Sequence, residues 1–288
     1  MLLSLVCFTA NSLFIKHLSS DRHIDPWLTM SFRFGIGLLV TAVLFGPSGV
    51  LKVERSFQSW LLASRGVLGA LGTAAYYSTV GPLGAGKSTL IGNTWCVWGA
   101  IMAAVVLHER LGLRKVVGIV IAIIGLVFLT DISPESLAHD GKWEAISLAG
   151  AVTAAMVVVV IRQLTKTETS ATIFASQCIY GLLFSLPFAL GHGIHLTAPD
   201  VGLLVVAALC ASIGQLAMTE GFRFLTVAAG GAMQVTLPLL ISTGGILFFG
   251  EHFTFVQALG GALILAGSFQ TVVGVRWRGF SERGRRSC

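Results

Sequence analysis

Residues 81–89 read GPLGAGKST and match the phosphate-binding pattern in which a glycine is followed, after four residues, by Gly-Lys-Ser. In nucleotide-binding proteins such a loop joins a buried strand to a helix, whose N-terminal N–H groups hold the phosphates. Here apolar segments long enough to cross a membrane lie on both sides of the stretch. This context argues against an NTPase that uses Gly81 to Ser88, and the glycines suit a tight turn and close helix packing.

The composition is that of a membrane protein. Hydrophobic residues make up 55% of the 288 residues, charged residues 11%, and the mean hydropathy is +0.84. Soluble domains carry about 25% charged residues, so this chain cannot cover a water-exposed surface. The five cysteines show no Cys-x-x-Cys or metal-ligand spacing, and we expect no disulfide framework, no metal and no cofactor.

The apolar segments predict an all-α integral membrane protein with ten transmembrane helices. Each segment has the roughly 17–25 residues that a membrane-spanning helix needs. The segments lie near residues 2–18, 27–46, 59–80, 84–107, 113–130, 143–162, 171–190, 200–222, 227–249 and 254–274.

The distribution of Lys and Arg predicts the orientation. If the N-terminus is cytoplasmic, thirteen basic residues of the connectors and tail lie on that side and three on the other. Membrane proteins concentrate basic residues on the cytoplasmic side, so we expect both termini to be cytoplasmic and the chain to cross the membrane several times. The basic tail, residues 276–288, suits anionic lipid and requires no nucleic acid.

The two halves of the chain repeat each other. A shift of 142 residues superposes the pairs Gly72/Gly214, Thr94/Thr236, Glu109/Glu251, Gly118/Gly260 and Gly125/Gly267. Each half holds five predicted helices, an odd number, so the second copy is inverted, as in many secondary transporters. We therefore divide the chain into repeats at 1–135 and 141–275 and a tail at 276–288.

Aromatic residues near the bilayer centre could form a binding wall. Trp95 and Trp98 share one face of the fourth segment, next to Asn93. Tyr76 and Tyr77 of the third segment could join them. Two alternatives stay open, because tryptophans at this depth either fill a helix interface or line a cavity.

Neutral polar residues in other segments could complete such a cavity. Each of them alone could also serve as a helix-to-helix hydrogen bond. Together they suit a neutral or aromatic amino acid better than a sugar phosphate, which needs clustered Arg and Lys. These candidates are Asn11, Gln177, Gln215, Gln234 and Thr236.

Four of the charged residues within the apolar segments are candidates for a functional or paired role. Arg33 and Lys87 could meet a substrate carboxylate, or they could extend toward the membrane surface and pair there. Arg65 and Glu220 are both closer to the cytoplasmic side, and we expect them to pair as an inner gate or as structural glue.

Residues common to both halves favour structural roles. Glu109 and Glu251 each stand just before a helix, where a negative charge suits the helix dipole. The glycines at 118 and 125, and at 260 and 267, each mark a flat helix face that packs within the bundle or across a homodimer.

Several of these stretches resemble one known family. FTANSLFIKHL with Lys16, and DPWLTMSFRFGIGLLV with Arg33, resemble the first two helices of EamA-type transporters of the drug/metabolite transporter superfamily. VVLHERLGLRKVVGIVIAIIGLVFL and LFFGEHFTFVQALGGALILAGSF resemble the Glu-then-Gly ending of both halves of that family. The resemblance implies a ten-helix carrier that exports small metabolites, often amino acids. It also implies a kink at Pro238, whereas Cys96 at the matching place gives no reason for one in the first half.

We therefore expect a secondary transporter, not an enzyme, that exports neutral or aromatic amino acids by alternating access. Its partners would be a small-molecule substrate and the lipid bilayer. The alternatives are a multidrug or organic-cation carrier of the same superfamily, a membrane NTPase, and a scaffold or receptor that transports nothing.

Overall fold

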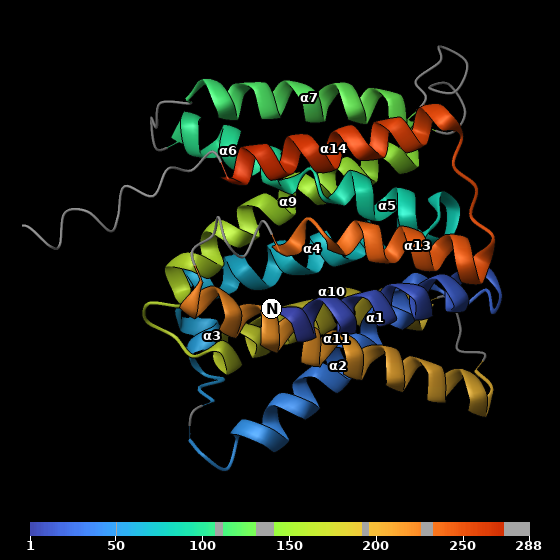
Figure 1. The fold of residues 1–288 in the computed structure, drawn as a ribbon. Helices are drawn as coiled ribbons and strands as arrows, with labels where there is room; N and C mark the ends of the chain where they lie inside the picture. Colours follow the sequence, from blue (N-terminus) through green and yellow to red (C-terminus); the bar gives the residue numbers. More distant parts are fainter. Residues whose placement is uncertain (50, 107–111, 131–140, 192–195, 226–232, 274–288) are drawn as a thin grey trace, which may run out of the picture.

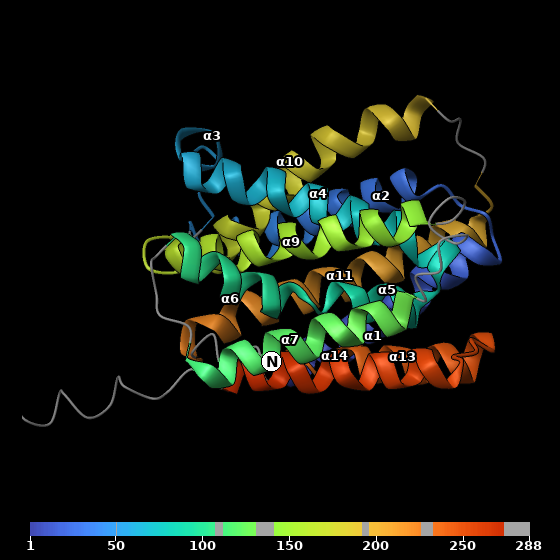
Figure 2. The ribbon, with the colours of Figure 1, turned by 90° about the horizontal axis from the view of Figure 1, so that it is seen from above.

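The computed structural model describes residues 1–49, 51–106, 112–130, 141–191, 196–225 and 233–273, and these residues are helical apart from short turns. The helices lie side by side in one bundle with roughly aligned axes (Figures 1 and 2). The end of the bundle where α1 begins is called the Leu2 end below, and the opposite one the Ser20 end. The first half comprises α1 (Leu2–Ser20), α2 (Pro26–Phe45), α3 (Arg55–Gln58), α4 (Trp60–Leu83), α5 (Ala85–Gly92), α6 (Trp95–Val106) and α7 (Leu113–Thr130). The second comprises α9 (Gly141–Leu164), α10 (Ser170–Gly191), α11 (Ala198–Phe224), α13 (Leu237–Phe249) and α14 (Phe255–Val273).

Seven of the described helices are long and apolar enough to cross a membrane, namely α1, α2, α7, α9, α10, α11 and α14. The third predicted segment forms the 24-residue helix α4, which is less apolar and contains Arg65. The fourth segment is divided into α5 and α6, and α13 is a shorter apolar helix of the ninth. The sequence therefore located the helical segments, but two of them are interrupted.

The two interruptions occupy equivalent places in the repeat. The first is a turn at Asn93 and Thr94, and the second, 142 residues later, is a turn at Val235 and Thr236. The Thr94 hydroxyl donates to the carbonyl of Ile91 at 2.7 Å, and the Thr236 hydroxyl donates to the carbonyl of Met233 at 2.7 Å. Such side-chain bonds compete with the helix ladder.

The sequence put a kink in the first half in doubt, because Cys96 stands there in the place of Pro238, but the structure has a break in both halves. Pro238 lies in the first turn of α13, where a helix tolerates proline. The first half breaks at the matching place although Cys96 stands there, because Asn93 and Thr94 terminate the ladder without a proline.

Helices of the first half pack mainly on helices of the second. The pairs in contact are α7 with α14, α4 with α9, α2 with α10, α1 with α11 and α5 with α13. The α7–α14 pair lies together along one side of the bundle (Figure 1). The functional cavity must therefore form where the two halves meet.

The glycine faces meet each other at the α7–α14 contact. A Cβ atom on Gly125 would lie 2.6 Å from the Gly260 carbonyl oxygen, and one on Gly118 would lie 2.8 Å from that of Gly267. Both distances are too short for a real contact, so only glycine lets the backbones come this close. The sequence left open whether this face packs within the bundle or across a homodimer. In the structure it packs within the chain.

Candidate functional site

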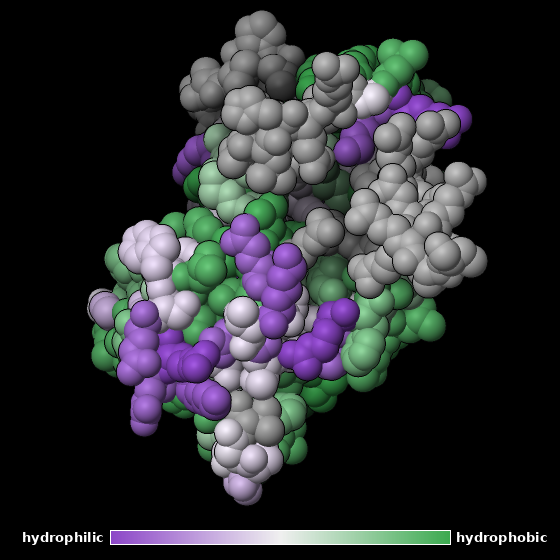
Figure 3. Space-filling view, turned by 90° about the vertical axis from the view of Figure 1, so that its left-hand side faces the viewer, coloured by the Kyte–Doolittle hydropathy of each residue, from purple (hydrophilic) through white to green (hydrophobic). Residues whose placement is uncertain are grey.

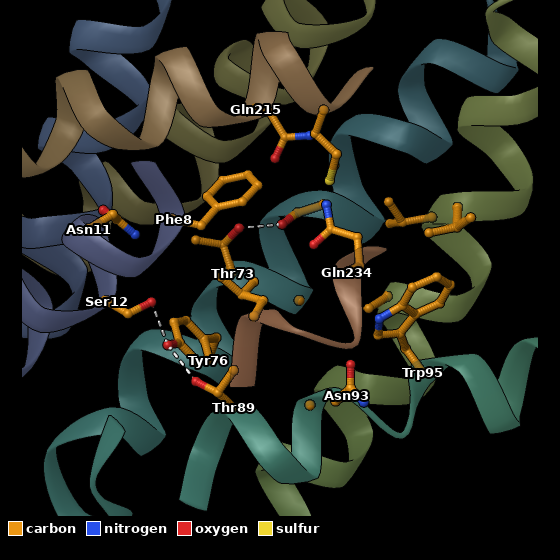
Figure 4. Close-up of a pocket in the computed structure, with 18 of the residues that line it drawn as sticks. Phe8, Asn11, Ser12, Thr73, Tyr76, Thr89, Asn93, Trp95, Gln215 and Gln234 are labelled. Carbon is orange, nitrogen blue, oxygen red and sulfur yellow. Dashed lines mark hydrogen bonds between the residues drawn. The ribbon is translucent and has the colours of Figure 1, made fainter. Parts of the chain in front are cut away.

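A cavity of about 280 Å³ lies between the two halves of the bundle. Helices α1, α2, α4, α5 and α6 contribute to its wall from the first half, and α9, α10, α11 and α13 from the second (Figure 4). Eleven predicted site residues line it: Asn11, Arg33, Arg65, Tyr76, Tyr77, Asn93, Trp95, Gln177, Gln215, Gln234 and Pro238. The rest of the wall is mainly apolar, including Phe8, Leu68, Val157, Val158, Met218, Phe222, Leu237 and Ile241.

One tyrosine of the cavity ties α4 to α1 and α5. The Tyr76 hydroxyl donates to the Ser12 hydroxyl at 2.8 Å, and it lies 3.0 Å from the Thr89 hydroxyl (Figure 4). This cluster fixes the aromatic ring at the cavity wall.

The second tyrosine supports an arginine. Arg33 of α2 donates from Nη1 to the Tyr77 hydroxyl at 2.9 Å, and that hydroxyl donates to Asn11 Oδ1 at 3.4 Å. The Arg33 guanidinium also lies 5.5 Å from the centre of the Tyr77 ring, within the range of a cation–π contact. Arg33 is only 7% exposed.

A second arginine enters the cavity from α4. Arg65 is 1% exposed and donates from Nη2 to Gln177 Oε1 at 2.8 Å. Both buried guanidinium groups are therefore bonded to neutral oxygens. The predicted Arg65–Glu220 pair is not formed. Glu220 instead accepts a hydrogen bond from the Ser170 hydroxyl at 2.6 Å and lies 3.8 Å from Arg223.

The wall also presents hydrogen-bond donors without partners. Arg33 keeps its Nε free, and Arg65 keeps both Nε and Nη1 free. The amide nitrogens of Asn93, Gln215 and Gln234 are likewise buried without a partner in the structure. Every one of these atoms is a buried N–H donor, so the two guanidinium groups of the lining keep hydrogen-bonding capacity that the protein itself does not use.

Three predicted binding residues lie outside the lining. Trp95 borders the cavity, whereas Trp98, one turn further along α6, does not, and its indole nitrogen is buried without a partner. Lys87 pairs with Glu144 of α9 at 2.8 Å. Thr236 uses its hydroxyl to end the helical turn before α13.

The glycine-rich stretch forms the turn between α4 and α5. Gly84 adopts φ +86°, which disfavours other residues, and α5 begins directly after it. The Glu251 carboxylate accepts hydrogen bonds from the N–H groups of Ala85 at 2.6 Å and Gly86 at 3.0 Å. The helix N-terminus that would hold a phosphate in an NTPase is thus bound to a side chain of the same protein.

Lys16 completes this contact at the Ser20 end. Its ammonium group donates to the Gly81 carbonyl at 3.1 Å and lies 4.0 Å from Glu251. Gly250, in the left-handed conformation with φ +60°, ends α13 directly before Glu251. Glu251 therefore caps α5, not the start of α14 that follows it in the sequence. Its repeat partner Glu109 lies outside the described residues.

At the Leu2 end, charged groups join α3, α11 and the turn after α9. Arg55 pairs with Glu168 at 2.8 Å, and Arg223 donates to the Glu168 carbonyl at 3.1 Å. Figure 3 faces this end and shows hydrophilic side chains gathered among hydrophobic ones. Within the described ranges, no three His, Cys, Asp or Glu side chains come together in a way that could hold a metal.

Sequence reasoning missed the hydroxyl groups of the wall and the role of Arg65. Ser12, Thr73 and Thr89 line the cavity, but small hydroxyl residues are too common in apolar helices to stand out. Arg65 did stand out as a charge within a membrane helix, which is a usual mark of a functional site. The sequence placed Arg65 in an inner gate or structural pair because Glu220 lies at a similar depth, but Glu220 contacts Ser170 and Arg223 instead.

Comparison with known proteins agrees with these features. The sequence matches the EamA-like transporter family twice, over residues 1–131 and 141–273. An uncharacterized transporter of Helicobacter pylori (strain ATCC 700392 / 26695) is 23% identical over 279 residues, which cover 92% of this chain and 90% of that protein. A solved crystal structure of a protein described without a function has 19% identity and a TM-score of 0.67, covering 93% of this chain and 96% of its own, and shows the same fold. The chain therefore belongs to the EamA-like transporter family, as a multi-pass integral membrane carrier and not an enzyme.

Proposed function

We propose that this transporter exports small carboxylate-bearing metabolites across the bacterial inner membrane by alternating access, with neutral and aromatic amino acids as first candidates. The observation that carries the proposal is the cavity shared by both halves, which combines buried arginine and amide donors with aromatic and apolar walls. A carboxylate accepts hydrogen bonds from such donors, and an apolar side chain fits such walls.

The proposal includes ten transmembrane helices in two inverted repeats, at residues 1–135 and 141–275. The contacts between the halves support this arrangement. Helices α2 and α7 each contact their own repeat counterpart, α10 and α14, whereas α1 and α4 contact α11 and α9, respectively. A two-fold axis between the halves would produce this pattern, because it exchanges α1 with α9 and α4 with α11.

In the proposed orientation the Leu2 end is cytoplasmic, together with the basic tail at 276–288. The contact between Glu251, Lys16 and the start of α5 then closes the cavity toward the outside. Wall residues such as Leu68, Val158 and Phe222 extend the cavity toward the cytoplasmic end. In this proposal the structure represents an inward-facing state, and export requires the Glu251 contact to open.

Two other functions fit the site less well. An organic cation would have to enter a cavity that already holds two buried guanidinium groups, which repel it. An NTPase would need the start of α5 for phosphate, but Glu251 is bonded there. A homodimer stays a prediction. The glycine faces of α7 and α14 no longer support it, because they pack against each other within the chain.

Counterflow in proteoliposomes tests the proposal. Vesicles loaded with unlabelled amino acids would be given labelled Phe, Trp, Leu, Thr, Lys or Glu outside. Entry of the label without a net gradient of the substrate would show exchange. We expect uptake of at least one carboxylate-bearing neutral substrate, and its loss in Trp95→Ala. Trp98→Ala is the matched control, because Trp98 lies one turn away and outside the cavity. Failure of every member of the panel would reject the amino acids as substrates.

A further inference from the structure

From the two buried arginines we infer that the cavity selects an organic anion, with a carboxylate and an apolar body but no ammonium group. This inference rests on the proposed carrier of carboxylate-bearing metabolites, and among them it puts acids without an ammonium group in the place of the amino acids as first candidates. An amino acid has both charges, so it offers a cation as well as an anion to the same wall. The corresponding 2-oxo or 2-hydroxy acid offers only the anion.

The charge in the cavity is the first argument. Arg33 and Arg65 are more than nine-tenths buried, and their hydrogen-bond partners are the neutral oxygens of Tyr77 and Gln177. Burying a charge is costly unless an opposite charge compensates it. Among the described lining residues there are two arginines and no carboxylate, so a bound anion would supply the compensation.

The carboxylates of the described helices and turns are engaged elsewhere, which is the second argument. Glu144 pairs with Lys87, Glu168 with Arg55, and Glu251 caps α5. Asp200 interacts with Thr197 and Arg22, and Glu220 with Ser170 and Arg223. These groups lie at helix ends and connectors, and each already has a partner there.

The free donors provide the third argument. Arg33 Nε, Arg65 Nε and Arg65 Nη1 are buried without partners, in two side chains that line the cavity. A carboxylate can accept about four hydrogen bonds through its two oxygens, and guanidinium groups match its geometry. An ammonium group is itself a donor and would face these N–H groups.

The wall and the size of the cavity limit the rest of the substrate. About 280 Å³ is close to the lower limit for small-molecule sites, roughly 300 Å³. Phe8, Trp95 and Ile241 give the wall an apolar part, which suits an aromatic or branched carbon body. A phosphate ester, which keeps two charges strongly hydrated, is less suited to such a wall.

Three probes with the same ring test the inference in proteoliposomes of the purified protein. Phenylpyruvate has a carboxylate only, phenylalanine has both charges, and phenethylamine has an ammonium group only. We expect labelled phenylpyruvate to exchange at least about tenfold faster than phenylalanine, and phenethylamine not to exchange, because like charges in such a site cost several kcal/mol. An inside-positive potential should accelerate phenylpyruvate entry and leave phenylalanine entry unchanged.

Arg33→Gln and Arg65→Gln should each reduce phenylpyruvate exchange by about tenfold, the loss expected for one charged hydrogen-bond donor, and should lower the phenylpyruvate-to-phenylalanine ratio, because a cavity with one cation fewer disfavours the ammonium group less. Arg55→Gln, which removes a guanidinium at the Leu2 end, is the matched control and should leave the ratio unchanged. Should an arginine variant fail to fold, the three-probe comparison on the unaltered protein still decides. Phenylalanine exchange equal to or faster than phenylpyruvate exchange would overturn the inference and keep the proposed function. Exchange of neither these probes nor any amino acid would instead reject the proposed function.

Discussion

Two contacts between the halves of this transporter are built in opposite ways. Along α7 and α14 the backbones meet through glycines, with Gly125 against Gly260 and no charge involved. At the start of α5 the halves meet through charge, because Glu251 accepts from two N–H groups and stands near Lys16. The first contact depends on shape and the second on ionised groups.

This difference indicates that the α7–α14 contact is permanent and that the contact of Glu251 with α5 is reversible. A backbone-to-backbone contact is lost only when the helices move apart, which gives up many small packing interactions together. A helix N-terminus can exchange its anion, or lose it when the carboxylate is protonated, without any change in packing. In the proposed cycle the α7–α14 pair therefore stays together while the α5 contact opens and closes.

The largest expected effect is on stability, through Gly125→Ala. An added Cβ would lie 2.6 Å from the Gly260 carbonyl oxygen and 2.7 Å from the Ile264 nitrogen, so the helices must separate. We expect a loss of about 1–3 kcal/mol in the free energy of unfolding, measured as a lower melting temperature in detergent. Gly35→Ala is the matched control, because nothing lies within 4 Å of a Cβ there. Equal melting temperatures for the two variants would contradict a permanent backbone contact between α7 and α14.

The same comparison shows what the sequence could predict. Glycines spaced seven residues apart in both halves indicated a packing face, because only small residues let helices approach so closely. The identity of the facing helix could not be predicted, since it depends on how the two halves fold against each other. Likewise, the 142-residue shift matched Glu109 with Glu251, but a contact of Glu251 with α5, 165 residues away in the chain, has no local signal.

The cavity was predicted in its residue types better than in its geometry. Polar and aromatic positions such as Asn11, Tyr77 and Gln215 line it, because polar groups in apolar helices turn toward the protein interior. Trp98 differs from Trp95 only by one turn, and whether an indole reaches the cavity depends on the break at Thr94. That break results from side-chain hydrogen bonds, which proline counting does not detect.

The charged contact should show a smaller effect, on conformation and not on folding. Glu251→Ala removes the acceptor of two N–H groups, and a charged hydrogen bond contributes about 1.5–3 kcal/mol. In a protein whose native cysteines are replaced, Thr73→Cys would report access to the cavity. We expect labelling by a membrane-impermeant maleimide from the Ser20 side to rise about tenfold or more.

Glu144→Ala is the control for that measurement. It also removes a paired carboxylate at the Ser20 end, but Glu144 contacts Lys87 and not the α5 N–H groups. Its labelling rate should stay within about twofold of the parent protein, since a single pair of this kind contributes at most about 1 kcal/mol. A similar rise in both variants would mean that general loosening, and not release of α5, opens the cavity.

The smallest expected effect is that of Lys87→Ala. In a phosphate-binding loop this lysine would be indispensable, but here its ammonium group is 2.8 Å from Glu144, and both side chains are 18% exposed. The pair lies at the Ser20 end and Lys87 does not line the cavity, so substrate exchange should stay within about threefold of the parent protein. Binding of a fluorescent ATP analogue should be undetectable in both proteins. Saturable ATP binding that disappears in Lys87→Ala would mean that phosphate can displace Glu251 from α5, and the charged contact between the halves would then be under nucleotide control.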